Sequence, residues 1–383
     1  MVESAALLVD EVLPRLPMRQ WVLSVPYPLR FLFARESQVM GKVMSIVYRT
    51  IASYLIQQAG LTRRVARTGA VTLIQRFGSA LNLNVHLHML FLDGVYVADS
   101  DPTVAPAFRR VPAPTTAQLQ AVLEHISQRI GRYLEHQGLL VRDPENDYLQ
   151  LDALDEEAAC MDRLRGHSIT YRIALGRHAG RKAFTLQTLP ATEALGDEHL
   201  AKAAGFSLHA GVWAGANDRA KLERLCRYIA RPAVSNERIA LTECGHVRYT
   251  LKTPYRDGTT HVYFSPLDFM ARLAALVPKP RVNLTRFHGV FAPNSKLRSQ
   301  VTLSGRGKRL ATAAQTPAER HQAMGWAQLL KRVFQIDITH CEHCGGKVKI
   351  IGSIEDAATI RRILEHLERR ARGPPVQGDS LAH

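Results

Sequence analysis

The sequence predicts an α+β fold: a central antiparallel sheet flanked by helices, with a helical insertion and a small C-terminal region. Apolar runs of strand length separated by short turn signals predict the sheet. Segments with apolar residues at helical spacing lie between these runs and predict the flanking helices. A chain of 383 residues can bury a large core and should contain two or three structural units.

The first hundred residues carry the strongest strand signals. Strands are expected at 20–26, at 71–77 and in the apolar run 81–92, whereas 36–60 has the spacing of a long helix or a helical hairpin. The dipeptide Asp93-Gly94 is typical of a hairpin turn, so we expect residues 95–97 to return beside the preceding strand.

The middle of the chain changes character. A loop rich in Pro, Asp and Thr leads into an amphipathic helix that begins near Thr116, and an acidic segment follows. We therefore interpret 98–167 as a helical insertion. Further strands are predicted at 168–175, 182–188 and 206–213. The main domain then comprises 1–97 and 168–300, and a basic C-terminal region spans 301–383, with a disordered tail from Arg369.

The net charge of +16 and the pI near 9.9 favour a polyanionic partner, most commonly nucleic acid. The alternative is a charge that merely keeps the chain soluble. The sequence has no run of 18 consecutive apolar residues and no secretory signal, so we expect a cytoplasmic protein without a membrane partner. Five cysteines do not make a disulfide framework, which agrees with a reducing compartment.

Two histidines one residue apart, His86 and His88, lie within the third predicted strand. Residues i and i+2 of a strand point to the same face, so both imidazoles can reach one metal ion. The alternative is a pair of core histidines whose ring nitrogens form ordinary hydrogen bonds. The apolar residues on both faces indicate a buried strand, where two neighbouring imidazoles without a shared partner would be costly.

A second informative segment is the predicted helix that precedes Pro232, with Asn217 or Asp218 as its N-cap. Tyr228 lies at the edge of its apolar stripe, among cationic residues. Such cations would bind a DNA backbone and lower the cost of forming a phenolate for attack on phosphorus. The alternative is an ordinary half-buried tyrosine. The candidate DNA-binding residues are Lys221, Arg224, Arg227 and Arg231.

Together these segments resemble the HUH endonuclease superfamily, and within it the rolling-circle insertion-sequence transposases. The resemblance extends over about residues 5–300 and is carried, in order, by Leu73–Gly78, Leu81–His86 and His88, Leu225–Pro232, Tyr249–Lys252, Asp257–His261 and Phe287–Asn294.

The resemblance implies a mechanism and a substrate. His86 and His88 would bind Mg²⁺ or Mn²⁺ with a third ligand, for which Gln75 and His209 are the candidates. Tyr228 would attack single-stranded DNA at the ends of a mobile element and form a 5′-phosphotyrosine. The resemblance also implies that the protein acts in the bacterial cytoplasm, in association with the nucleoid. Because the adduct keeps the bond energy, a strand can be rejoined without ATP, which agrees with the lack of a phosphate-binding G-x-x-x-x-G-K-[ST] loop. The alternatives are a replication initiator or relaxase, and an inactive DNA-binding remnant.

The sequence departs from the family pattern at two places. Many relatives have two tyrosines four residues apart, but Arg224 occupies the position four before Tyr228, as in single-tyrosine relatives associated with insertion-sequence common regions. Relatives also carry a cysteine-rich zinc-binding domain before the transposase domain, and this chain begins where that domain would have ended. We expect a truncated copy, with weakened recognition of element ends or without activity.

The C-terminal region contains Cys341 and Cys344, a C-x-x-C pair that is half of a structural Zn²⁺ site. His340 and His343 are nearby candidates for further ligands, and Cys244 with His246 is a more distant pair. The alternative is two thiols without metal. A basic run before this region is a candidate track for DNA phosphates; it comprises Lys279, Arg281, Arg286, Lys296, Arg298, Arg306, Lys308 and Arg309.

Overall fold

The computed structural model describes residues 2–97, 104–143, 147–150, 156–189, 199–303, 326–341, 344–348 and 354–371. The chain divides into two compact units, Met1–Ala313 and Ala314–His383.

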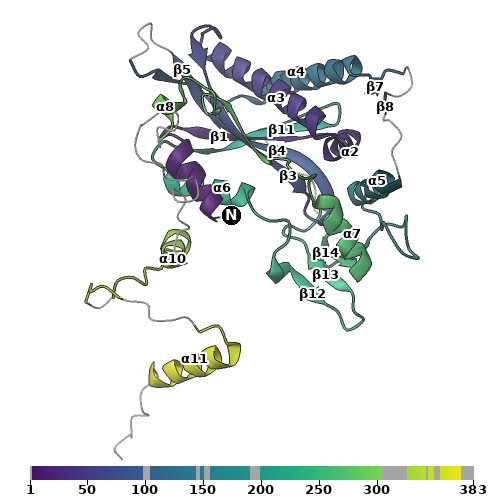
Figure 1. Cartoon of the computed structure of the whole chain (residues 1–383), viewed down its shortest axis with the longest axis vertical. Helices are drawn as coiled ribbons and strands as arrows, with labels where there is room; N and C mark the ends of the chain where they lie inside the picture. Colours follow the sequence, from purple (N-terminus) through teal and green to yellow (C-terminus); the bar gives the residue numbers. More distant parts are fainter. Residues whose placement is uncertain are drawn as a thin grey trace, which may run out of the picture. The chain divides into compact units, whose positions relative to one another are not determined.

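A six-stranded sheet forms the centre of the first unit (Figure 1). All its neighbouring strands are antiparallel, so the predicted central antiparallel sheet is confirmed. Its order is β10 (Leu200–Ala203), β11 (Phe206–Ala214), β1 (Met18–Ser24), β4 (Leu83–Leu92), β3 (Gly69–Phe77) and β15 (Thr285–Gly289). The histidine strand is β4, and it lies between β1 and β3.

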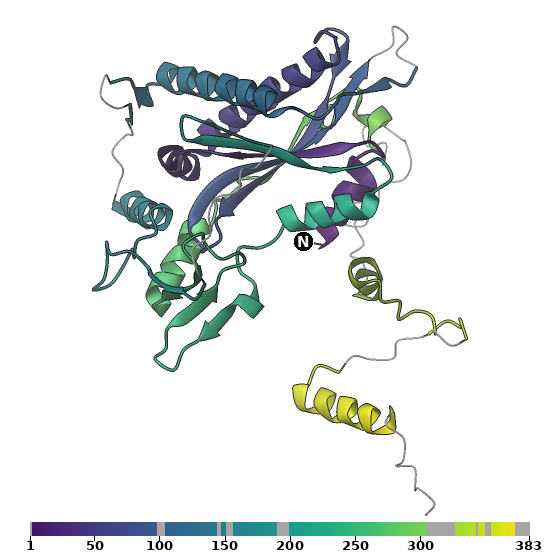
Figure 2. The same ribbon diagram turned by 180° about the vertical axis from the view of Figure 1, so that it is seen from behind.

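Helices cover both faces of this sheet (Figures 1 and 2). One face packs against α2 (Tyr27–Arg35), α3 (Ser37–Gln58) and α4 (Thr116–His136), and the other against α1 (Val2–Leu7), a π-helical turn (Leu8–Val12) and α6 (Arg219–Ile229). Alternate residues of β4 enter the two cores, with Leu87 and Met89 on the first face and Leu90 and Leu92 on the second. The prediction of a strand buried on both sides is confirmed.

The helices follow from their apolar spacing and their caps. In α4 a capping box joins Thr115 and Gln118, and the predicted stripe from Leu119 to Leu134 is buried. The segment predicted as a long helix or a hairpin is the single helix α3. In the described part of the chain, α3 is also the one helix long and apolar enough to span a membrane, but more than half of its apolar window is buried, as in a core helix.

The hairpin prediction at Asp93-Gly94 is wrong. The strand that follows, β5 (Gly94–Val97), does not pair with β4 but forms a separate sheet with β2 (Ala66–Arg67) and β6 (Ala107–Arg110). Gly94 is needed for another reason: a Cβ at this position would lie 2.4 Å from the Arg109 carbonyl oxygen. The glycine thus permits close strand approach rather than a turn.

The prediction of a strand at 168–175 is also wrong, because α5 (Glu156–Ile169) extends into it. Beyond that helix, only Arg172 forms an isolated bridge, with Lys182. The strands predicted at 182–188 and 206–213 correspond to β9 (Phe184–Gln187) and β11.

The remaining elements are smaller. A four-stranded sheet has the order β12 (Ile239–Leu241), β13 (Val247–Thr250), β14 (Thr259–Phe264) and β9, and α7 (Pro266–Leu276) packs beside α5. Short elements are β7 (Leu140–Val141), β8 (Tyr148–Leu149), a 3-10 turn (Asn236–Arg238) and α8 (Arg298–Val301). The second unit contains α10 (Trp326–Phe334) and α11 (Ala357–Ala371). Of the tail predicted to be disordered, the first residues belong to α11 and the rest lie outside the described residues.

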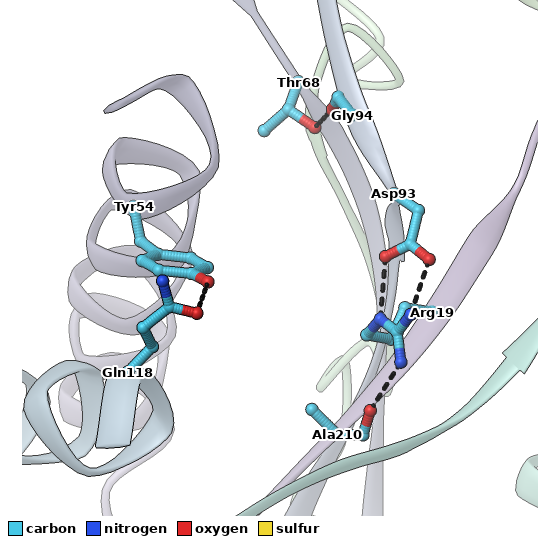
Figure 3. A network of polar contacts seen from close by, with 7 residues as sticks. All are labelled: Arg19, Tyr54, Thr68, Asp93, Gly94, Gln118 and Ala210. Carbon is cyan, nitrogen blue, oxygen red and sulfur yellow. Dashed lines mark hydrogen bonds and ion pairs between the residues drawn. The ribbon is translucent and has the colours of Figure 1, made fainter. Parts of the chain in front are cut away.

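A buried ion pair joins the end of the histidine strand to its neighbours (Figure 3). Arg19 of β1 donates from Nε to Asp93 Oδ1 at 2.8 Å and from Nη2 to Oδ2 at 2.9 Å. Its Nη1 donates to the Ala210 carbonyl oxygen of β11 at 2.9 Å. Because both side chains are almost fully enclosed, this bidentate pair holds three strands in register beyond the last residue of β4.

Candidate active site

A cavity of about 650 Å³ lies between the histidine strand, the C-terminal end of α6 and the segment after β13. Its walls bring together residues that are far apart in the sequence: His86 and His88, Gln75 of β3, Tyr228 and Arg231, and Lys252. The structure therefore places the predicted nucleophile and the two predicted metal-binding histidines around one cavity.

The two imidazoles point to the same face of β4, with ring centroids 4.9 Å apart. His86 Nδ1 donates to the Asn84 carbonyl oxygen at 2.8 Å, which leaves Nε2 with a free lone pair. His88 Nδ1 contacts the Gln20 amide at 2.7 Å. The Nε2 of His88 is enclosed and has no hydrogen-bond partner among the described residues.

Both rings are neutral at physiological pH. Burial lowers the pKa of His86, with a further contribution from nearby Arg30 and Arg231. Burial, then the His86 ring and Arg231, lowers the pKa of His88 to about 3. A neutral imidazole whose Nδ1–H donates a hydrogen bond, as that of His86 does, is the form in which histidine binds a metal through Nε2.

The two candidates for the third ligand have different positions. Gln75 is directly opposite His86 in the β3–β4 register and lines the cavity. Its Nε2 donates to the Ile229 carbonyl oxygen of α6 at 3.2 Å, which orients the amide beside the tyrosine helix. His209 belongs to β11, with Val22 between it and His88 in the register, and its ring packs against Gly211. It does not line the cavity.

No group of three or more His, Cys, Asp or Glu side chains suited to a metal ion occurs among the described residues. A third protein ligand at this cavity would therefore be another kind of side chain, and the amides that line it are Gln75, opposite His86, and Asn84.

Tyr228 lies on the last turn of α6, where Leu222, Cys226 and Ile229 of the predicted apolar stripe are buried and Leu225 is half-buried. Asp218 is the N-cap and accepts from the Lys221 backbone N–H. The Tyr228 side chain is 43% exposed. The Lys252 ammonium lies 4.2 Å from the centroid of its ring and the Arg231 guanidinium 4.4 Å, so two cations contact the phenol.

The four predicted DNA-binding residues do not all reach the cavity. Arg231 lines it, with its guanidinium between the Tyr228 and Phe77 rings. Lys221 instead lies over the Trp213 ring, and Arg224 is exposed on the helix surface. Arg227 is partly buried, with Nη1 enclosed. These three remain candidates for contacts with DNA outside the cavity.

Sequence reasoning missed two residues of the site. Gln20, a polar residue within the apolar strand β1, contacts His88 and was detectable as an interruption of the apolar pattern. Lys252 belongs to a stretch quoted for the family resemblance, but no local signal indicated its contact with Tyr228, because it lies 24 positions further along the chain, after strand β13.

In the second unit, Cys341 and Cys344 lie beside two backbone hydrogen bonds. Gly345 N donates to the Cys341 carbonyl oxygen and Cys341 N to the Gly346 carbonyl oxygen, both at 2.8 Å, and His340 bridges to Lys347. Gly345 has a φ of +69°, which favours glycine. His343 lies outside the described residues, so a zinc site here stays a prediction.

Comparison with known proteins identifies a family. The model of the family Y2_Tnp, described as "Putative transposase", matches residues 69–298. No curated protein and no solved structure matches the chain. The matched span contains both histidines, Gln75, Tyr228 and Lys252, and transposases bind DNA, cut it and transfer its strands. Because this span covers more than half of the 383 residues, the chain belongs to this transposase family.

Proposed function

We propose that this transposase is a single-tyrosine enzyme of the HUH type, which nicks and rejoins single-stranded DNA during rolling-circle transposition. The observation that supports this most directly is the shared cavity of Tyr228, His86 and His88. A nucleophile beside two neutral imidazoles is an arrangement for phosphodiester chemistry, because the tyrosine and a metal ion can act on the same phosphate.

In the proposed reaction, the Tyr228 oxygen attacks the phosphorus and the phenol proton goes to water. The bond from phosphorus to the 3′ oxygen breaks, and that oxygen takes up a proton and leaves as a free 3′-OH. Arg231 and Lys252 stabilise the phenolate and the charge that develops on the phosphate, since both contact the Tyr228 ring. Attack by a 3′-OH on the phosphotyrosine reverses these bond changes and rejoins a strand.

The donor set fits a divalent cation. The His86 Nε2 lone pair and the enclosed Nε2 of His88 face a common cavity with the Gln75 amide. His86, His88 and Gln75 would hold Mg²⁺ or Mn²⁺, and the bound ion would polarise a phosphate oxygen. As placed, the Gln20 Nε2 donates to His88 Nδ1; with a metal ion on His88 Nε2, the Gln20 amide would turn so that its oxygen accepts from Nδ1–H.

The placement of Gln75 and His209 yields a testable difference. Replacing Gln75 by Ala should weaken Mn²⁺ binding by about tenfold or more, and His86→Ala should weaken it further, because each removes one ligand. His209→Ala is the matched control and should leave the affinity unchanged, since that ring packs against Gly211. Electron paramagnetic resonance of free Mn²⁺ gives the affinities. Equal losses in Gln75→Ala and His209→Ala would contradict the proposed ligand set.

The function itself is tested by trapping the covalent intermediate. A single-stranded oligonucleotide labelled at its 3′ end is incubated with the protein and Mn²⁺, or with a chelator, and resolved on a denaturing gel. We expect a labelled protein band that requires metal, because the 3′ fragment stays joined to Tyr228. DNA binding without any adduct on candidate element ends would instead favour an inactive DNA-binding remnant, and an adduct confined to replication or transfer origins would favour an initiator or relaxase.

A further inference from the structure

A second polar cavity, of about 330 Å³, lies between the first turns of α3 and the edge strand β15. In β15, Phe287 packs into the core beneath α6, whereas His288 points the other way and stacks on Tyr48 of α3, with ring centroids 4.9 Å apart. This cavity is therefore on the opposite face of the sheet from Tyr228. The polar residues that line it are Ser37, Gln38, Ser45, Arg281, Arg286 and His288.

The lining carries positive charge and hydrogen-bond donors. Arg281 and Arg286 supply two guanidinium groups, and no carboxylate lines the cavity among the described residues. The nearest acidic neighbour in sequence, Glu36, forms an ion pair with Arg35 at 3.4 Å. A cavity with two arginines, two hydroxyls and an amide suits an oxyanion, and planar guanidinium groups recognise phosphate in particular.

Two of these groups are enclosed without a partner. Arg286 Nε and His288 Nε2 are shielded from solvent and have no hydrogen-bond partner among the described residues. Burial, then Arg286, lowers the pKa of His288 to about 4, so its ring is neutral. Enclosed polar atoms without partners are costly in a folded protein, and a bound anion that accepts hydrogen bonds from them would lower this cost.

The N-terminus of α3 adds to the same environment. Its N-cap, Glu36, makes no side-chain capping bond, so backbone N–H groups of the first turn, next to Ser37 and Gln38, remain available. Such N–H groups attract anions, and here they occur together with the two arginines and the enclosed nitrogens.

We infer that this cavity binds a phosphate group. Because the chain is a transposase, we assign the group to the backbone of a DNA strand that passes over the edge of the sheet at β15. β15 pairs with β3, the strand that carries Gln75, so the two cavities lie on opposite faces of neighbouring strands. A free phosphate ion is the other source of the same chemistry. The inference does not require Tyr228 to be the nucleophile.

The test is a DNA-binding measurement with charge-matched variants. Arg281→Gln/Arg286→Gln should weaken binding of a single-stranded 40-mer by about tenfold, and the slope of log affinity against log salt should fall by about 0.7 for each lost phosphate contact. The control, Arg109→Gln/Arg110→Gln, removes the same charge from exposed positions of β6 and should have a small effect. An equal effect of both pairs would overturn the inference, because net charge alone would then explain it.

The free-ion source is tested by thermal unfolding with inorganic phosphate, with sodium chloride of equal ionic strength as the reference. If phosphate raises the melting temperature of the wild type but not of Arg281→Gln, the cavity binds the free ion. If Arg281→Gln also lowers the affinity for DNA, the site binds a phosphate group of the DNA backbone. Arg281 is exposed, so this single variant should fold even if the double variant is destabilised. If phosphate stabilises neither protein and DNA binding is unchanged, the cavity is not a phosphate site.

Discussion

Replacing Tyr228 by Phe is expected to reduce covalent adduct formation at least about a thousandfold while DNA binding stays within a few-fold of the wild type. The substitution removes only the hydroxyl oxygen, which is the attacking atom in the proposed reaction, so no route to the adduct remains. The ring keeps its contacts with Arg231 and Lys252. The measurement is the denaturing-gel assay with 3′-labelled DNA, combined with a binding titration of the same variant.

Tyr249→Phe is the matched control, because Tyr249 lines the same cavity. Its hydroxyl donates to the Ala233 carbonyl oxygen at 3.4 Å, a long contact, and its ring is buried beneath Arg238. We expect adduct formation to change by only a few-fold. An adduct that survives in Tyr228→Phe and disappears in Tyr249→Phe would show that Tyr249, and not Tyr228, is the nucleophile.

The residues that could be predicted from the sequence are those whose chemistry is visible in a local pattern. His86 and His88 share a face because a strand repeats every two residues, and Tyr228 lies at the edge of a helical stripe because a helix repeats every 3.6. Both patterns depend on a few neighbouring residues, which explains why strand β4 and helix α6 were predicted correctly, together with most of their burial.

The features that could not be predicted depend on contacts between distant segments. Asp93-Gly94 has the composition of a hairpin turn, but Asp93 is bound by Arg19 of another strand and Gly94 faces the Arg109 backbone. The choice between Gln75 and His209 likewise depends on the strand order, which places β3 beside β4 and inserts β1 before β11. Local propensity contains no information on that order, so both residues were reasonable candidates until the register was known.

Breaking the Arg19–Asp93 pair should strongly destabilise the sheet that carries the histidines. Asp93→Ala leaves the Arg19 guanidinium buried without its carboxylate, which should lower the free energy of unfolding by about 3–5 kcal/mol. The loss concerns the fold rather than the chemistry, because Asp93 lies beyond the last residue of β4 and outside the Tyr228 cavity. Urea unfolding followed by circular dichroism measures it.

Two further variants separate the ion pair from a general effect of lost charge. Asp147→Ala breaks the exposed pair with Arg142 and should hardly change stability, because solvent screens these charges. Arg19→Leu/Asp93→Leu removes both buried charges and should cost less than Asp93→Ala alone, since no uncompensated charge then remains in the core. If Arg19→Leu/Asp93→Leu is instead less stable than Asp93→Ala, the attraction between the two charges and the hydrogen bond from Arg19 to the Ala210 carbonyl oxygen stabilise the sheet. The cost of leaving a buried arginine without its carboxylate would then be the smaller effect.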